Sequence, residues 1–436
     1  MHRAAAWFIL AVLALLFITA CGGNSSTTGT KVTVRVETIA GQPTLPLSVA
    51  YQIEDGDWAW LRPGEDASYS FYLPAGSKRY GVTVRCPRLH YEMGPRTSAT
   101  ALYQLTITDT TEPHFVCPAE DEEVASGTLS FNASSVTGAK STMYFYQQSA
   151  RWLRKVATRY PQRFYFYPQE RGDFLIAAYS SERVYPKPNT LLAARLLRDV
   201  DFEDGLSLNI TLSDADGVTW ANVQPLTQSQ FWTGRYTVGI SSAGGIVSEN
   251  NLGQGDKRGG TYARIANADA GDFYIFSART QHDLDHDKYF ILYYHRFIEA
   301  VAAGDLAANF PVTFPEDYEP TESNGRLNFN LSYPESVAGY FFTFRLSRGS
   351  ARLHVWASSA WLDGQNSYTC PDLSAVNGFA SFDPNRVSKW LVCTISDDIG
   401  YGEMLSQPLS AERIVPVAGF GRALEIGISC VGLQEY

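Results

Sequence analysis

The sequence has little of what helical, nucleic-acid-binding or membrane-spanning proteins need. It contains only 4 methionines, few runs of helix-forming residues and no long amphipathic helix between candidate strands, which argues against a parallel α/β sheet. Basic residues are also scarce, with 35 Lys and Arg against 45 Asp and Glu. This balance disfavours nucleic acid, because affinity for nucleic acid depends on neutralising phosphates. After the first 20 residues, no apolar run is long enough to cross a bilayer.

Complete catalytic motifs are also missing. The chain has no Gly-x-Ser-x-Gly elbow, no His-Glu-x-x-His pair and no motif that pairs a catalytic cysteine with a local histidine. His90, His114 and His354 are scattered. A catalytic centre would therefore require the fold to bring a histidine together with carboxylates, and we expect a protein that is not an enzyme.

The first 20 residues have the order of an export signal. Arg3 is the only early positive charge, residues 4–18 are apolar, and Thr19 and Ala20 precede Cys21. The segment resembles a bacterial lipobox, which implies cleavage before Cys21 and acylation of its thiol, so that lipid anchors the protein to a membrane. Because Gly22 follows the cysteine, we expect the cell envelope, and the outer membrane in a bacterium with two membranes. Residues 21–30 then form a flexible tether.

Removal of residues 1–20 takes away Arg3 alone among the charged residues, so the mature chain has 34 basic against 45 acidic side chains and a net charge of about −11. Its 25 Tyr, 24 Phe and 9 Trp suit pleated sheets. Strict alternation of apolar and polar residues recurs in four segments, which are 32–36, 206–212, 327–331 and 424–428. Turn signals lie between such segments at Asp55-Gly56, Asp216-Gly217 and Arg348-Gly349-Ser350. The pattern predicts an all-β fold of tandem antiparallel β-sandwiches.

Acidic or proline-bearing links divide the mature chain near residues 119, 205 and 318. The division predicts four β-sandwiches, at 31–119, 120–205, 206–318 and 319–436. No repeat of fixed period indicates a propeller or a solenoid.

Two stretches resemble known surface modules. The segments concerned are 49–52, 55–58, 69–71 and 79–86 in the first stretch and 126–129, 172–178 and 194–200 in the second. The first stretch resembles the leading immunoglobulin-like module of bacterial surface lipoproteins. The second resembles a transthyretin-like, carboxypeptidase-regulatory-like sandwich. The resemblance covers roughly residues 31–205, implies a fold and a cell-surface location, and brings no catalytic residues.

Five cysteines remain after Cys21, and export makes disulfides chemically accessible. Alternation places Cys86 and Cys117 on inward faces of one short domain, so we expect them to be bonded. For a second bond, Cys370 and Cys393 are closer in sequence, whereas Cys393 and Cys430 both lie on inward strand faces. We favour the pairing of Cys370 with Cys393 by a small margin, which leaves one of the five cysteines without a partner in this scheme.

The densest polar cluster is a candidate site for a divalent metal ion, between the apolar segments 273–276 and 289–294. Its five potential ligands are His282, Asp283, Asp285, His286 and Asp287. In an extended segment, alternating side chains point to opposite sides and could not all reach one ion. We therefore favour a solvated hairpin loop and no cofactor. Ser213 to Gly217 and the glycine-rich residues 253–260 are interpreted as a hairpin turn and a loop.

Aromatic residues give the remaining functional lead, because flat rings stack on sugars and peptides. The candidates are Trp58, Trp60, residues 164–167, Trp356 and Trp361; Trp58 and Trp60 share a face and are expected in the core. We expect a lipid-anchored, non-catalytic surface protein with a structural or adhesion role. A carbohydrate- or ligand-binding envelope lipoprotein is the alternative hypothesis, and an envelope hydrolase is the third. The expected partners are the membrane, through Cys21, and an envelope glycan or surface protein.

Overall fold

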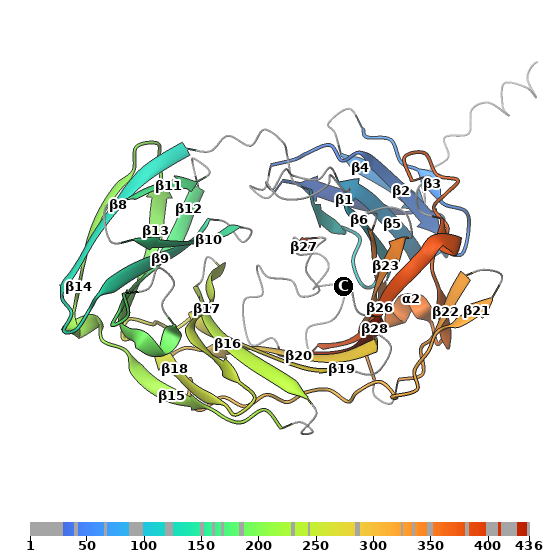
Figure 1. The fold of residues 1–436 in the computed structure, drawn as a ribbon. Coiled ribbons are helices and arrows are strands. Elements are labelled where there is room, and N and C mark those ends of the chain that lie inside the picture. The colour runs from blue at the N-terminus through green and yellow to red at the C-terminus, as the bar shows by residue number, and fades with distance from the viewer. Residues whose placement is uncertain are drawn as a thin grey trace, which may run out of the picture.

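The computed structural model describes residues 29–433 apart from seventeen short internal segments. These segments are 39–41, 65–67, 87–98, 118–124, 149–151, 159–161, 167–169, 183–186, 228–231, 243–244, 284–287, 324–325, 334–335, 347–351, 380–382, 398–408 and 411–424. The export signal and Cys21 lie outside the described residues. Within the described part the chain is all-β, as predicted, and consists of several sheets packed face to face (Figure 1). No helix in this part is long and apolar enough to cross a membrane.

One sheet of fourteen described strands runs through the molecule and links the regions at its two ends (Figure 1). In spatial order its strands are β15 (Thr219–Val223), β18 (Gly260–Arg264), β17 (Gly245–Asp256), β16 (Thr233–Ser242), β19 (Phe273–Asp283), β20 (Lys288–Glu299), β28 (Glu425–Leu433), β26 (Val387–Asp397), β23 (Gly339–Leu346), β24 (Arg352–Ser358), β6 (Ala99–Thr106), β5 (Arg79–Cys86), β2 (Ser48–Ile53) and β3 (Ala59–Trp60). The pairs are antiparallel except for β24 with β6, which are parallel.

This long sheet joins segments that are far apart in the sequence. β28, from the C-terminal end, pairs with β20 on one side and with β26 on the other. β24 pairs with β6, although about 250 residues separate them. Hydrogen bonding therefore continues across the pieces that the sequence divides near residues 119 and 318. Those boundaries stay a prediction, but strands from the first, third and fourth predicted pieces all lie in the long sheet.

At the N-terminal end, a small sheet covers one face of the long sheet. Its strands are β27 (Leu409–Ser410), β7 (His114–Val116), β1 (Thr30–Glu37) and β4 (Tyr69–Leu73). The predicted alternation of β1 is confirmed, because Val32, Val34 and Val36 are buried in the core between the two sheets. The aromatic pair Tyr103 and Phe115 bridges this core with ring centroids 4.1 Å apart.

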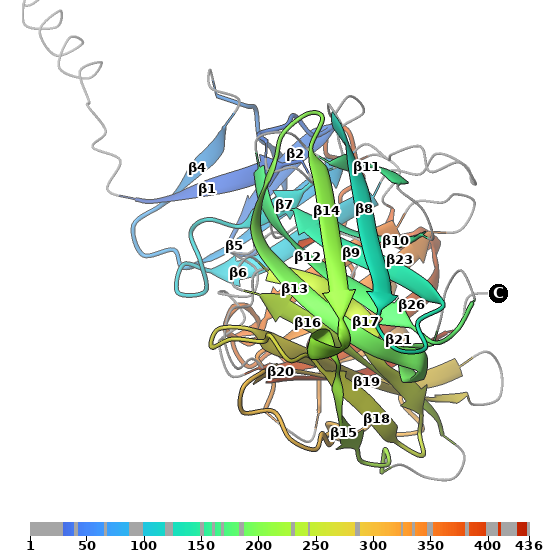
Figure 2. The ribbon, with the colours of Figure 1, turned by 90° about the vertical axis from the view of Figure 1, so that its left-hand side faces the viewer.

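The second sandwich packs two sheets against each other (Figure 2). One contains β10 (Trp152–Thr158), β9 (Ser141–Gln148), β12 (Glu170–Tyr179) and β13 (Leu191–Phe202), and the other β11 (Gln162–Phe166), β8 (Ala125–Ser135) and β14 (Ser207–Ser213). Alternate residues of β12 serve two cores: Phe174 and Ile176 face β8 and β14, whereas Leu175 and Ala177 pack with β16 to β18 of the long sheet. The buried carboxylate of Asp173 accepts a hydrogen bond from the Asp199 amide (2.8 Å) and another from the Ser242 hydroxyl, across that junction.

On its other face, near the C-terminal end, the long sheet carries the fourth core. The sheet β21 (Thr321–Ser323), β22 (Arg326–Asn330) and β25 (Ser367–Thr369) and the short helix α2 (Ser359–Leu362) cover it. The Ser358 hydroxyl accepts a hydrogen bond from the Trp361 amide (3.0 Å) at the start of α2, and it donates to Asp109 (2.6 Å). Arg79 pairs with Glu54 and Asp55 and lies over the Trp361 ring, so α2 is also tied to the β2–β3 turn.

Two local predictions need correction. Asp216-Gly217 is a turn, but β14 and β15 lie in different sheets, so it is not a hairpin. Residues 253–260 are not a loop: β17 extends to Asp256 and β18 begins at Gly260. Glycines are required there because an added Cβ would lie 2.4 Å from the Tyr236 ring at Gly255 and 2.3 Å from the Tyr236 hydroxyl at Gly260. The arms on either side of Arg348-Gly349-Ser350 pair as antiparallel strands β23 and β24, whereas these three residues lie outside the described part of the chain.

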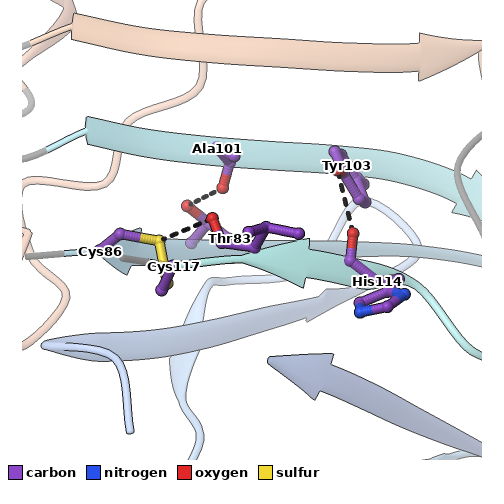
Figure 3. The surroundings of a disulfide bond; sticks show 7 residues. Thr83, Cys86, Ala101, Tyr103, His114 and Cys117 are labelled. Atoms are coloured by element: carbon purple, nitrogen blue, oxygen red, sulfur yellow. Dashed lines mark hydrogen bonds between the residues drawn. A yellow bond between two sulfur atoms is a disulfide. The ribbon is translucent and has the colours of Figure 1, made fainter. Parts of the chain in front are cut away.

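The disulfides confirm one pairing and correct the other. Cys86 and Cys117 are bonded, and both are buried beside the small sheet (Figure 3). The second bond joins Cys393 to Cys430, so the expected pairing of Cys370 with Cys393 is wrong. Cys393 and Cys430 occupy directly opposed positions of neighbouring strands, a register that outweighs proximity in sequence. Cys370 is a free, buried cysteine, and burial raises the pKa of its thiol strongly.

Candidate functional site

Only two of the five residues of the candidate metal cluster are described, and these two point apart. His282 and Asp283 are the last two residues of β19, so they point to opposite faces of the sheet. His282 packs beside the Trp232 ring, and Asp283 accepts a hydrogen bond from Gln281 (2.6 Å). Asp285, His286 and Asp287 lie outside the described residues. Among the described residues, no three potential ligands form a metal-binding group.

Most of the aromatic candidates are packing residues. Trp356 is 2% exposed and Trp361 is 6% exposed, and both lie in cores of the long sheet. The expectation that Trp58 and Trp60 are both core is wrong for Trp60, which is 43% exposed with the Arg62 guanidinium 5.0 Å from its ring centroid. The expectation holds better for Trp58, which is partly buried and packs against the core that contains Trp361. The side chains of residues 164–167 lie outside the described part of the molecule.

A different group of residues gathers on β16, β19 and β20. β19 extends beyond the predicted segment 273–276 to Asp283, and every second residue from Ser277 onward is polar. These side chains share a face with neighbours at opposed positions of β16 and β20. We call this group the polar face, and its residues are Thr233, Arg235, Thr237, Ser277, Arg279, Gln281, Asp283, Tyr293 and His295.

Hydrogen bonds and ring contacts order the centre of the polar face. The Arg279 guanidinium lies 5.5 Å from the Tyr293 ring centroid, a cation–π contact, and Arg279 Nη2 donates to Gln281 Oε1 (2.5 Å). Gln281 Nε2 in turn donates to Asp283. A chain of three side chains therefore holds Arg279 in place along one strand.

His295 and Ser277 form a second pair on this face. His295 Nδ1 and Ser277 Oγ are 2.8 Å apart, at directly opposed positions of β20 and β19. Burial lowers the pKa of His295 to about 4, so the imidazole is neutral at pH 7. A base this weak is poorly matched to activating a hydroxyl nucleophile at neutral pH, which favours a hydrogen-bonding role for the pair.

The polar face continues into an apolar surface without a break in the sheet. Along one row of opposed residues, Thr233 and Gln281 are followed by Ile291 of β20, Cys430, Cys393, Phe341 and Trp356. The apolar residues belong to the core that the long sheet shares with the small N-terminal sheet. The same face therefore packs a core at one end and presents partly exposed polar groups at the other.

Sequence reasoning missed the polar face, although a signal was present. Ala278 and Thr280 continue the buried alternation that Tyr274 and Phe276 begin, but they are small and do not look like core residues. The alternation of buried and polar positions through residue 283 would have extended the strand and placed Ser277, Arg279 and Gln281 together.

Comparisons with known proteins add little to this geometry. No family model and no curated protein sequence matches the chain. Among solved structures, fervidolysin from Fervidobacterium pennivorans, a keratinolytic enzyme related to subtilisin, shows 14% identity and a TM-score of 0.16, with 45% of this chain and 33% of that chain covered. The Bacillus anthracis TIE protein shows 8% identity and a TM-score of 0.16 (64% and 50%). The pilus adhesin SpaC from Lactobacillus rhamnosus GG, in its open conformation, shows 12% and 0.15 (76% and 44%).

In these three matches the chain spans a third to a half of the other protein's length. At TM-scores this low, the matches carry no argument about fold or function. The functional conclusion therefore depends on the arrangement of this chain's own residues.

Proposed function

We propose that this chain is a lipid-anchored surface protein with a non-catalytic binding role, and that the polar face is its contact surface. The observation that supports the role is the change of character along one continuous sheet, from a packed apolar core to ordered, partly exposed polar and aromatic groups. Strands buried on both faces favour apolar residues throughout, so a row of Ser, Arg, Gln and Asp on β19 has a reason other than core packing.

The rest of the structure supports rigidity. Several strands of the long sheet come from distant parts of the chain, and one disulfide joins neighbouring strands at its centre. Trp356 and Trp361 pack inside it. A rigid sheet holds binding side chains in place before contact, which lowers the entropic cost of association.

The binding role is tested by blocking the polar face. Thr233 and Thr211 are both exposed strand residues, and only Thr233 belongs to the polar face. Thr233→Trp should weaken binding of the full chain to intact cells or to an array of envelope glycans, whereas Thr211→Trp on β14 should leave it unchanged. Equal binding by both variants and the wild type would remove the polar face from the proposal.

The lipid anchor and the absence of catalysis have their own tests. Cys21→Ser should abolish incorporation of a labelled fatty acid and leave an uncleaved precursor, and equal labelling would refute the anchor. A fluorophosphonate probe should leave Ser277 unlabelled. Labelling that disappears in Ser277→Ala would instead support the hydrolase alternative.

A further inference from the structure

Two arginines of the polar face lie directly opposite each other. Arg235 of β16 pairs with Arg279 of β19 in the antiparallel register, which brings their Cβ atoms to about 5 Å on the same face. Like charges at opposed positions destabilise a sheet. The protein keeps this arrangement despite its net charge of −10 and its excess of carboxylates.

Neither arginine has a carboxylate partner among the described residues. Other described arginines do, for example Arg35 with Glu112, Arg198 with Asp272 and Arg326 with Asp372. The carboxylate in the same row is Asp256, opposite Arg235, and its Oδ2 accepts two hydrogen bonds from the Arg258 guanidinium, of 3.0 and 2.6 Å. That interaction lowers the pKa of Asp256 to about 2.

Arg279 is held in one orientation by its neighbours, and one of its N–H donors has no acceptor among the described residues. Its Nη2 is engaged by Gln281 and its plane lies over Tyr293, but its Nε is buried and has no hydrogen-bond acceptor within the described part of the chain. An unsatisfied buried donor is costly, and a donor next to a charged fork is a feature of anion recognition. Arg235, which is exposed, adds the second guanidinium.

We propose that the Arg235–Arg279 pair binds the carboxylate of an acidic polysaccharide. Guanidinium forks match the planar carboxylate. Asp256, Arg235 and Arg279 form one row, and together with Arg258, which is ion-paired with Asp256, they carry a net charge of +2. Thr237, Ser277 and Gln281 surround the pair with hydroxyl and amide groups that suit sugar hydroxyls. This inference rests on the binding role proposed above and names the class of its ligand.

The ligand class is tested by measuring binding of the full chain, in detergent, to three polymers that differ in carboxylate and sugar content. Polygalacturonate should bind saturably, and its carboxyl-reduced, neutral form should bind at least about tenfold more weakly. Polyglutamate supplies carboxylates without sugar and should also bind more weakly than polygalacturonate. Equal affinity for the neutral polymer would show that the ligand's carboxylate is not recognised. Equal affinity for polyglutamate would show that its sugar is not recognised.

The residues are tested by charge-matched variants. Arg279→Gln and Arg235→Gln should each weaken polygalacturonate binding by about tenfold, because each removes a charge-assisted hydrogen-bond donor. Arg279→Lys keeps the charge and loses the fork, so it should recover only part of the affinity. Arg35→Gln on β1 makes the same charge change beside Glu112 and should bind like the wild type.

Thermal unfolding of each variant separates a lost site from a lost fold. If the folded double variant Arg235→Gln/Arg279→Gln binds polygalacturonate as the wild type does, the inference is wrong. A wild type that binds cells but not polygalacturonate also defeats the inference and leaves the binding role standing. A wild type that binds neither defeats both.

Discussion

The two halves of one sheet face differ in what their side chains contact. Toward β24, the face carries Cys430, Cys393, Phe341 and Trp356, which pack against the small N-terminal sheet. Toward β16, the same face carries polar side chains in two hydrogen-bonded groups, Arg279 with Gln281 and Asp283, and Ser277 with His295. The backbone register continues through both halves, so the side chains alone decide which half is core and which half is available for binding.

The two halves also differ in what makes them rigid. The apolar half is held by burial and a disulfide, and each loss there leaves a cavity or an untied strand. The polar half is held by hydrogen bonds and a ring contact, which individually contribute less. Mutations should therefore have much larger effects on stability in the apolar half than in the polar half.

The largest effect is expected at Trp356. Its side chain is 2% exposed and lies 4.4 Å from Phe341, centroid to centroid. Trp356→Ala should lower the free energy of unfolding by about 3–5 kcal/mol, since it removes buried area and leaves a cavity. Trp220→Ala, at a site 42% exposed on the edge strand β15, should change it by less than about 0.5 kcal/mol. Denaturant unfolding followed by fluorescence measures both, and similar losses would contradict the assignment of Trp356 to the core.

Removal of the disulfide between β26 and β28 ranks second. Cys393 and Cys430 are 37 residues apart, so the Cys393→Ala/Cys430→Ala variant should lose about 2–4 kcal/mol of unfolding free energy through a less constrained unfolded chain. Alkylation without reductant, followed by peptide mass mapping, checks the pairing. Cys370 should be labelled only after denaturation, whereas labelling of Cys430 under those conditions would restore the Cys370–Cys393 alternative.

The two disulfides differ in how far the sequence alone predicts them. Local alternation sufficed for the all-β class and for Cys86 with Cys117, because each depends on residues within one short stretch. It did not suffice for Cys393 with Cys430, because that pairing depends on β28 inserting between β20 and β26, a contact between distant segments. Alternation identifies the face of a strand that is buried, but not the strand that lies beside it.

The polar face shows the same limit from another side. Arg235 and Arg279 are 44 positions apart, and no motif links them. Only the register of β16 with β19 makes them neighbours. The cluster from His282 to Asp287 was a candidate metal site because its residues are adjacent in sequence. Adjacent strand residues such as His282 and Asp283, however, point to opposite faces.

A smaller effect is expected at His295, where the polar half meets the apolar half. Its pKa lies at about 4, below the ordinary value of 6.5, so the unfolded chain binds its proton more readily than the folded one. The contribution of the neutral imidazole is complete above pH 6.5 and is lost as the pH falls toward 4. Because the side chain is partly exposed, we expect a loss of about 1–2 kcal/mol over that range.

His295→Gln should remove this part of the pH dependence. The difference in unfolding free energy between wild type and variant, measured by denaturant titration at several pH values, should slope between pH 6.5 and 4 and be flat above. A constant difference across that range would show that His295 titrates normally in the folded protein.

The smallest effect is expected at Arg235. Arg235→Gln removes an exposed charge that faces Arg279 and has no carboxylate partner among the described residues, so the free energy of unfolding should change by less than about 0.5 kcal/mol. The direction should be toward greater stability at low salt, because the variant relieves a like-charge contact, and 1 M salt should remove the difference by screening. Thermal unfolding at two salt concentrations measures this. A clear loss of stability would mean that Arg235 contributes to holding the sheet together. β16 would then belong to the structural half of the face, and the binding half would not extend beyond β19.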